Sequence, residues 1–228
     1  MDFISLGFAI LTFVAINNLS NCIVTRFSDE KKVDIKLNDY QLLLGETTRG
    51  IPIVVDMKID SHMLIIGLSN CGKSKLAEGC LKNKRVTVIN AFDEDFKSIR
   101  AKRITGEDNI LEYLENCLEG RTSSSEAHYV LVDEMLVLMR NKKIEKALAE
   151  LLAIARHYNL YIIALGQEGT REVIKCKNLF NVRVCMKQLE ESSFRTVLGC
   201  SVEERFLRQR EFYVVDNNGL RKGKTYSI

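Results

Sequence analysis

The chain lacks the cysteine and histidine patterns that mark zinc sites and disulfide frameworks. Its 228 residues include seven cysteines but no C-x-x-C pair, and three histidines are scattered among them. We therefore expect no zinc and no disulfide framework, and the odd number of cysteines suits a reducing cytosol. A single proline, no low-complexity tract, no internal repeat and a hydrophobic content of 46% are typical of one globular α/β domain with a small appendage.

The chain also lacks a strong excess of charge. Its net charge of +3 is too small to indicate a polyanionic partner. An argument for nucleic-acid binding must therefore depend on where the basic residues lie.

The N-terminal apolar run, FISLGFAILTFVAI over residues 3–16, is short for a membrane span. As a helix it would cover about 21 Å, less than the roughly 30 Å of a hydrocarbon core. Extension to Val24 reaches about 33 Å but adds the polar residues Asn17, Asn18, Ser20 and Asn21. No basic residue precedes the run, which argues against a cleaved signal peptide. The basic residues that follow would keep the bulk of the chain cytoplasmic; they are Arg26, Lys31 and Lys32.

These features divide the chain into three parts. Residues 1–26 form a hydrophobic N-terminal helix, residues 27–40 a polar link, and residues 41–228 the main domain. We expect the helix to anchor the chain to a membrane. A partner-binding amphipathic or buried helix, and a helix packed on the chain's own core, are the alternatives.

A phosphate-binding loop is the feature around which the main domain is organised. The apolar residues 64–66 are followed by GLSNCGKS and then by a helical pattern over residues 73–81, so G-x-x-x-x-G-K-S stands between a strand and a helix. In such a loop backbone N–H groups surround a β-phosphate, the lysine reaches the β- and γ-phosphates, and the serine ligates Mg²⁺. A plain glycine-containing turn is the alternative. The expected nucleotide-binding residues are Gly67, Leu68, Ser69, Asn70, Cys71, Gly72, Lys73, Ser74 and Lys75.

A second motif follows a predicted buried strand. Residues 129–132, YVLV, end at Asp133 and Glu134, and the carboxyl ends of parallel strands are where α/β sheets bind ligands. Asp133 can hold Mg²⁺ through water, and Glu134 can polarise a water for attack on the γ-phosphate. Alternatively, the two acids only cap the following helix. An acidic pair here favours hydrolysis over small-molecule kinase chemistry, which needs no water-activating glutamate.

The remaining sequence alternates strands and helices. We expect strands over residues 41–45, 51–55, 62–67, 85–90, 161–165 and 181–186, and helices over 109–118, 144–158 and 192–198. Residues 212–215 and 224–227 would form a terminal hairpin around Asp216–Gly219. This pattern predicts a mostly parallel sheet with helices on both faces, in a RecA-like (ASCE) P-loop core preceded by a β-hairpin. Gln167, after strand 161–165, would lie beside the γ-phosphate unless it is a surface residue in a turn.

The order of these segments resembles FtsK/HerA-type DNA translocases. The similarity begins with LLLGETTRGIPIVVDMKIDSHMLIIGLSNCGKSKL and continues through YVLVDEMLVLM, ARHYNLYIIALGQEGTREVI and NVRVCMKQLEESSFRTVLG. It covers the chain from about Asp39 to the C-terminus, in order, which is more specific than any one motif. Asn70 and Cys71 depart from the small residues usual in this loop. Asparagine tolerates left-handed backbone angles, and Cys71 predicts sensitivity to thiol reagents.

The resemblance implies an ATP-driven, Mg²⁺-dependent motor, usually a homo-oligomeric, hexameric ring that pulls double-stranded DNA through its pore. By position it assigns Lys73, Glu134 and Gln167 to catalysis, with Gln167 as the sensor, and Ser74 and Asp133 to the metal. A neighbouring subunit would supply an arginine that stabilises transition-state charge. The candidates are Arg183, Arg195 and Arg156.

Two basic loops are candidates for contact with DNA. One follows the Asp133–Glu134 strand and the other follows the sensor strand; their basic residues are Arg140, Lys142, Lys143, Arg171, Lys175 and Lys177. Contacts to phosphates would give salt-sensitive binding without sequence preference. Solvated surface charge is the alternative. No aromatic ladder accompanies these loops, so stacking on single strands is not indicated.

Among the family, a bare motor of this size resembles the genome-packaging ATPases of membrane-containing viruses. That likeness implies a ring docked on a membrane or on a membrane-embedded portal protein, at the cytoplasmic face of a membrane or at the packaging vertex of a virion. Plasmid conjugation coupling ATPases are the alternative within the family. A nucleotide-gated membrane scaffold that moves no DNA, and a hydrolase of small substrates, are alternatives of other classes.

Overall fold

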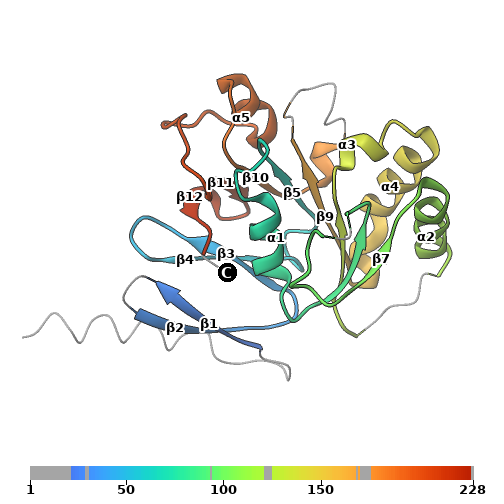
Figure 1. Ribbon diagram of the computed structural model, residues 1–228, viewed down its shortest axis with the longest axis horizontal. Coiled ribbons are helices and arrows are strands. Elements are labelled where there is room, and N and C mark those ends of the chain that lie inside the picture. The colour runs from blue at the N-terminus through green and yellow to red at the C-terminus, as the bar shows by residue number, and fades with distance from the viewer. Residues whose placement is uncertain are drawn as a thin grey trace, which may run out of the picture.

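The computed structural model describes residues 22–28, 31–92, 94–120, 125–167, 169 and 176–226 (Figure 1). Its first part comprises β1 (Cys22–Ser28), β2 (Lys31–Leu37), β3 (Gln41–Glu46), β4 (Pro52–Asp56), β5 (Met63–Ile66) and α1 (Lys73–Leu81). The middle part comprises β6 (Arg85–Ile89), β7 (Ala101–Ile104), α2 (Glu107–Glu119), β8 (His128–Val132), α3 (Met135–Leu138) and α4 (Lys142–Ile154). The last part comprises η1 (Ala155–Tyr158), β9 (Leu160–Gly166), η2 (Lys177–Leu179), β10 (Val182–Cys185), α5 (Glu191–Leu198), β11 (Glu211–Asp216) and β12 (Gly219–Lys224).

One large sheet organises the domain. Its strand order is β4-β3-β12-β11-β10-β5-β9-β8-β6-β7. From β10 to β7 every neighbouring pair is parallel, whereas the pairs that join β10, β11, β12, β3 and β4 are antiparallel. The predicted mostly parallel α/β sheet is therefore confirmed, with β5, which leads into the phosphate loop, near its centre.

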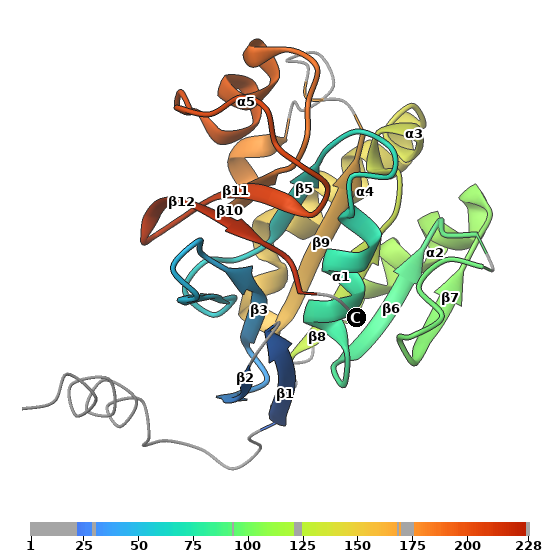
Figure 2. The ribbon, with the colours of Figure 1, turned by 60° about the vertical axis from the view of Figure 1, so that its left-hand side comes forward.

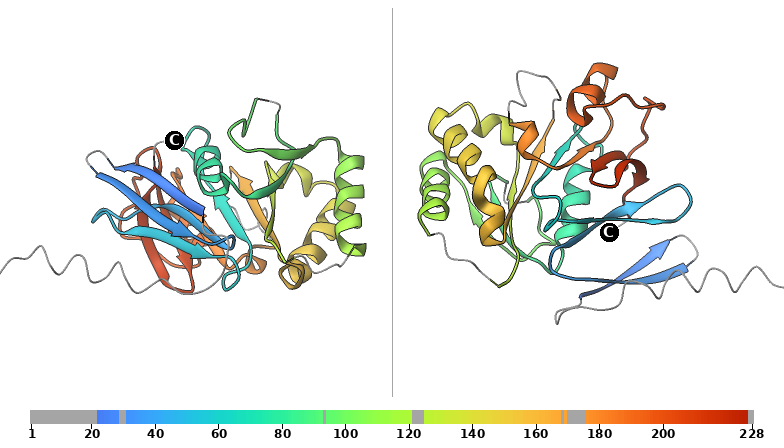
Figure 3. Two further views of the ribbon diagram at one scale, coloured as in Figure 1. Left: turned by 90° about the horizontal axis from the view of Figure 1, so that it is seen from below. Right: turned by 180° about the vertical axis from the view of Figure 1, so that it is seen from behind.

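Helices cover both faces of the sheet, as the sequence predicted (Figures 2 and 3). On one face, Leu76 of α1 belongs to the same core as Leu42 and Ile53 of the β3–β4 hairpin. The other face carries α2, α4 and α5, where Ile110 and Leu148 belong to a second core. The central strands are apolar on both sides because both faces are covered.

The N-terminal part of the described chain differs from the prediction. β1 and β2 pair as an antiparallel hairpin of their own (Figure 1). Residues 22–26, predicted as the end of a helix, lie in β1, and much of the predicted link 27–40 lies in β2. KKVDIKL alternates apolar and polar residues after its second lysine, which is the period of a strand.

The hydrophobic run itself, within residues 1–21, lies outside the described residues. None of the helices that the structure does describe combines the length and the apolar character needed to span a membrane.

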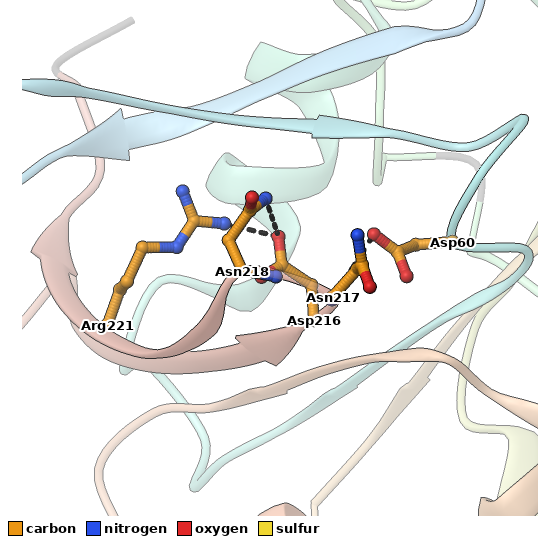
Figure 4. A network of polar contacts seen from close by, with 5 residues as sticks. All are labelled: Asp60, Asp216, Asn217, Asn218 and Arg221. Carbon is orange, nitrogen blue, oxygen red and sulfur yellow. Dashed lines mark hydrogen bonds and ion pairs between the residues drawn. The ribbon is translucent and has the colours of Figure 1, made fainter.

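A polar network ties the turn of the last hairpin to the loop before β5 (Figure 4). The buried carboxylate of Asp216 forms an ion pair with Arg221, and its Oδ1 accepts a hydrogen bond from Asn218 N at 2.9 Å. Asn217 N donates to Asp60 Oδ2 at 3.3 Å. The predicted Asn-Gly turn is confirmed, but the strand that follows it starts at once and spans Gly219–Lys224 rather than residues 224–227.

Candidate nucleotide-binding site

The phosphate loop connects β5 to α1 at the carboxyl edge of the parallel strands. Gly72, the N-cap of α1, has φ of 110°, and Asn70 has φ of 59°. Both residues thus have positive φ, which glycine adopts without steric cost and asparagine at low cost. Asn70 accommodates the turn even though it departs from the family pattern.

The start of α1 has the properties of an anion-binding helix terminus. Its cap offers no side-chain acceptor, and its first turn holds no acidic residue. The first hydrogen bond within the helix runs from Leu76 N to Gly72 O at 2.9 Å, so the N–H groups of the first turn lack acceptors there. These groups and the helix dipole favour a phosphate.

Gly67 allows two side chains to pack directly against the loop. A Cβ at this position would lie 2.7 Å from Cys71 Sγ and 2.8 Å from Met186 Cβ. Cys71 is only 3% exposed, and burial raises the pKa of its thiol. Because the thiolate is the reactive species, burial predicts that Cys71 reacts slowly, and its sensitivity to thiol reagents stays a prediction.

Two segments far along the chain hold the outside of the loop. Leu68 N donates to Lys187 O, after β10, at 3.0 Å. Arg210 N donates to Cys71 O at 2.9 Å, just before β11. Next to it, Gln209 donates from Nε2 to the loop carbonyl of Asn70 at 3.3 Å. The sequence motif gives no indication of these supports.

The Lys73 amine lies inside the loop. Its Nζ donates to Gly67 O at 2.7 Å and to Leu68 O at 2.9 Å, and the residue is 9% exposed. Its charge lies beside the N-terminus of α1, so two sources of positive potential meet at one place. Ser74, the next residue, is exposed on the first turn.

Asp133 follows β8 and lies near other carboxylates. Burial, reinforced by the negative charges of Glu134 and Asp95, raises the pKa of Asp133 to about 6. A bound cation would relieve this repulsion. Asn90, at the end of β6, donates from Nδ2 to Asp133 O at 3.2 Å. Sequence reasoning missed Asp95 and Asn90, although Asn90 could have been found because it is the polar last residue of the predicted strand 85–90.

A chain of hydrogen bonds joins the loop to the two motifs that follow β8 and β9. Ser69 Oγ donates to Gln167 Oε1 at 3.2 Å, and Gln167 Nε2 donates to Glu134 Oε1 at 2.6 Å. Glu134 has φ of 47°, a left-handed conformation that is uncommon for a residue other than glycine. The structure thus brings together residues that the sequence singled out separately.

These residues fit a nucleoside triphosphate with Mg²⁺. The glycine-capped helix and Lys73 suit phosphates, and the Ser74 hydroxyl and the Asp133 carboxylate suit the metal. No group of three or more His, Cys, Asp and Glu side chains able to hold a metal occurs in the described part of the chain. Mg²⁺ needs no such cage, since it commonly takes one or two carboxylates together with substrate phosphates and water.

The three candidate arginines lie in different environments. Arg183 on β10 is half-buried, and its Nη1 donates to Val197 O at 3.5 Å. Arg195 on α5 is exposed, and its Nη2 donates to Ser201 Oγ at 3.1 Å. Arg156 in η1 is exposed ahead of β9, at the sheet edge opposite the loop. Which arginine acts across an interface stays a prediction.

The described residues of the basic loops are also separated. Arg140, Lys142 and Lys143 are exposed at the turn between α3 and α4, where Lys142 pairs with Glu145 at 2.7 Å. Lys177 is half-buried, and its Nζ donates to the backbone of α5. Arg171 and Lys175 lie outside the described residues.

No family model matches the chain, and no curated protein matches its sequence. Its structure, in contrast, is similar to solved ATPases. The pCW3 conjugation coupling protein TcpA, in its monomer form with ATPγS, has a TM-score of 0.72 and 15% identity, over 89% of this chain and 69% of TcpA. The cytoplasmic domain of the type VII secretion ATPase EccC from Thermomonospora curvata has a TM-score of 0.67 and 17% identity, over 83% of this chain and 26% of EccC.

The third similar structure is viral. The genome packaging NTPase B204 of Sulfolobus turreted icosahedral virus 2, in complex with ATPγS, has a TM-score of 0.54 and 16% identity, over 74% of this chain and 98% of B204. All three are FtsK/HerA-type ATPases. At these identities the likeness establishes the fold, which is the one that the resemblance in sequence implied.

Proposed function

We propose that this chain is an ATPase whose hydrolysis drives the movement of double-stranded DNA. The observation that carries the proposal is the hydrogen-bond chain from Ser69 through Gln167 to Glu134. It links the loop for the phosphates to the carboxylate that would activate water. A protein that only bound a nucleotide would have no need of this link.

The residues have separable roles in hydrolysis. Lys73 and the N-terminus of α1 would bind and neutralise the phosphates, and Ser74 and Asp133 would hold Mg²⁺. Glu134 accepts the proton of the attacking water, and Gln167 orients that carboxylate. The water would attack the γ-phosphate of ATP as the bond to the β–γ bridging oxygen breaks and ADP leaves, and Mg²⁺, when bound, would neutralise charge on the phosphates. The backbone at Glu134 is left-handed, which a residue other than glycine keeps only when the surrounding structure holds it there. The fold therefore fixes the position of the Glu134 carboxylate.

Basic residues beside the site support the DNA part of the proposal. Arg140, Lys142 and Lys143 are exposed where α4 begins, and only the short helix α3 separates this basic segment from Glu134. Contacts from such side chains to phosphates do not read bases. The similarity to a conjugation coupling protein and to a viral genome packaging NTPase agrees with a DNA substrate.

The proposed biological role is the packaging of a viral genome, by a ring of copies docked on a membrane or on a portal within it. The similarity to B204 over 98% of that protein supports this role. Conjugative DNA transfer is the second candidate, because TcpA superimposes over more of this chain with a higher TM-score. A neighbouring capsid gene would favour packaging, and a neighbouring relaxase gene would favour transfer.

ATP turnover with and without duplex DNA tests the motor. We expect Glu134→Gln to lower turnover by about a hundredfold or more while ATP binding is kept, because the general base is lost. Glu150→Gln, at an exposed position on α4, is the matched control and should leave turnover unchanged. If Glu134→Gln kept normal turnover, the assigned chemistry would be wrong.

The same assay separates the motor from other classes. Turnover that duplex DNA never stimulates would contradict DNA translocation and favour a nucleotide-gated scaffold. Stimulation by a polypeptide alone would favour a role like that of the secretion ATPases. Removal of residues 1–24 should release the chain from membranes if that segment is the anchor.

A further inference from the structure

A second basic site lies at the edge of the sheet opposite the phosphate loop. There the turn between α1 and β6, the segment before β7, and the first residues of β7 surround a groove of about 640 Å³. The groove is lined by Lys82, Asn83, Lys84, Arg85, Val86, Ser98, Arg100, Ala101 and Lys102. None of these lining residues is acidic or aromatic.

The cations of this groove keep most of their charge uncompensated. Lys82, Arg85, Arg100 and Lys102 are exposed and form no ion pair with any residue whose side chain the structure describes. Lys84 is half-buried and donates from Nζ to Asn38 O at 2.7 Å. A second contact is weak, since the amine of Lys102 lies 5.9 Å from the centre of the Tyr113 ring. Four like charges facing one open groove repel one another, and a bound polyanion would relieve that repulsion.

The C-terminus of α1 does not account for this charge. A helix end carries about half a negative charge, which one nearby cation is enough to balance. Lys82, the C-cap of α1, already supplies that cation. The others come from segments beyond the helix, and Arg100 and Lys102 lie at the start of β7 on the sheet edge.

We propose that this groove binds the phosphate backbone of duplex DNA. The lining has no aromatic ring on which a base could stack, so neither a nucleotide base nor an unpaired strand would be held there. It also has no apolar pocket for the anchor side chains that dominate peptide binding, since Val86 is buried and Ala101 is small. Several exposed cations in an open groove suit a row of phosphates, which they can contact without reading sequence.

The groove is separate from the candidate ATPase site. Arg85 begins β6 and Asn90 follows its other end, so the length of that strand, about 13 Å, lies between them. The inference goes beyond the proposed function, which places DNA only at loops on the carboxyl edge. It rests on that function only for the identity of the polyanion.

Fluorescence anisotropy of a short labelled duplex of mixed sequence, with the full chain, tests the proposal. The groove variant is Lys82→Ser with Arg100→Ser, and the charge-matched control is Arg49→Ser with Lys146→Ser, all at exposed positions. We expect the groove variant to lose about tenfold in affinity at low salt, and the slope of log affinity against log salt to flatten by about two. The control should keep both. Basal ATP turnover should be unchanged in both variants, which also shows that they fold.

Three outcomes would overturn the proposal. Equal losses in the groove and control variants would mean that overall charge, not the groove, sets binding. Wild-type affinity for polyglutamate but not for the duplex would assign the groove to an acidic polypeptide. If the groove variant bound the duplex as tightly as wild type, the groove would not be a DNA-binding site, and the proposed motor would be unaffected. Conversely, the duplex could bind in the groove and yet never stimulate ATP turnover. That result would contradict the proposed motor but support the proposed groove.

Discussion

Gln167 donates a hydrogen bond from Nε2 to Glu134 Oε1 at 2.6 Å, and its own Oε1 accepts one from Ser69 in the phosphate loop. The two residues follow neighbouring strands, β9 and β8, so the sheet itself brings them together. A γ-phosphate that attracted Gln167 or Ser69 would change the hydrogen bond to Glu134. The state of the nucleotide could therefore be transmitted to the carboxylate in one step.

Replacement of Gln167 should separate positioning from binding. We expect Gln167→Ala to lower kcat for ATP about tenfold with a KM within about twofold of wild type, because the amide orients Glu134. Gln167→Asn keeps the amide on a side chain one carbon shorter, so its kcat should lie between those of Gln167→Ala and wild type. Steady-state kinetics at several ATP concentrations measure both quantities. A rise in KM with an unchanged kcat would assign Gln167 to nucleotide binding instead.

A methyl group at position 67 should damage the phosphate loop. In Gly67→Ala the added carbon would lie 2.7 Å from Cys71 Sγ and 2.8 Å from Met186 Cβ, so the loop must shift. We expect a loss of at least about tenfold in ATP affinity, measured with a fluorescent ATP analogue. Gly50→Asn is the control, because nothing lies within 4 Å of a Cβ added at Gly50 and asparagine tolerates its φ of 73°. Unchanged affinity in Gly67→Ala would show that the loop yields easily.

Folding stability should fall in acid because of His62. This residue is 1% exposed, and its Nδ1 accepts a hydrogen bond from Ile162 N at 3.0 Å. Burial lowers the pKa of His62 from 6.5 to about 4. The folded state therefore binds fewer protons than the unfolded state between these values. The stabilisation by neutral His62 is complete above pH 6.5 and is lost as pH falls toward 4.

Comparison with His62→Asn isolates this effect. Asparagine does not titrate and tolerates the φ of 64° at this position. Between pH 7 and pH 5 we expect the wild type to lose about 2 kcal/mol more unfolding free energy than the variant, measured by urea denaturation. His128, with a pKa lowered to about 4 by burial, and Asp133 contribute equally in both proteins. His157 is exposed, so His157→Asn should lose as much unfolding free energy between pH 7 and pH 5 as wild type does. If wild type lost no more than His62→Asn, the acid sensitivity would not come from His62.

Thiol reagents should modify Cys71, in the phosphate loop, later than a more accessible cysteine. Cys71 is buried with a raised pKa, whereas Cys200 is half-buried. With a small aromatic disulfide at neutral pH, we expect Cys200 to react at least about tenfold faster than Cys71. ATP turnover should therefore decline more slowly than thiols disappear. Loss of activity in step with the first thiol, abolished by Cys71→Ala, would show that the loop opens readily.

Local signals in the sequence predicted most of the elements. The helix α1 spans Lys73–Leu81 as expected, because the motif and the apolar spacing mark the same boundary. The central strands were found because burial on both faces makes them continuously apolar. The edge strand β7 was missed because Ile104 is its only buried residue, so AKRI shows no apolar pattern. β12 was displaced because its residues are largely polar and exposed.

The candidate site was predictable only where its residues belong to a motif. Lys73, Asp133 and Glu134 belong to motifs that follow recognisable apolar strands. They were expected to lie close together because the carboxyl ends of parallel strands meet at one edge of the sheet. The hydrogen bond from Gln167 depends on β9 lying beside β8, and strand order is not a local property. Asp95 and Arg210 reach the site through loops whose paths are set by long-range packing. Such long-range contacts produce no motif of fixed spacing that could be recognised in the sequence.

The dependence of the phosphate loop on Lys187 and Arg210 has a consequence for synthesis on the ribosome. The loop is translated early, but the backbone groups that hold its outer side are made more than a hundred residues later. At translation rates of about 5–20 residues per second, the nascent loop waits roughly 7–27 s for these partners. For most of that time β5 also lacks its neighbours in the sheet, because β9 and β10 are made shortly before Lys187. Capacity to bind ATP should therefore arise only after Arg210 has been made, and nascent chains that end before it should compete poorly for the nucleotide.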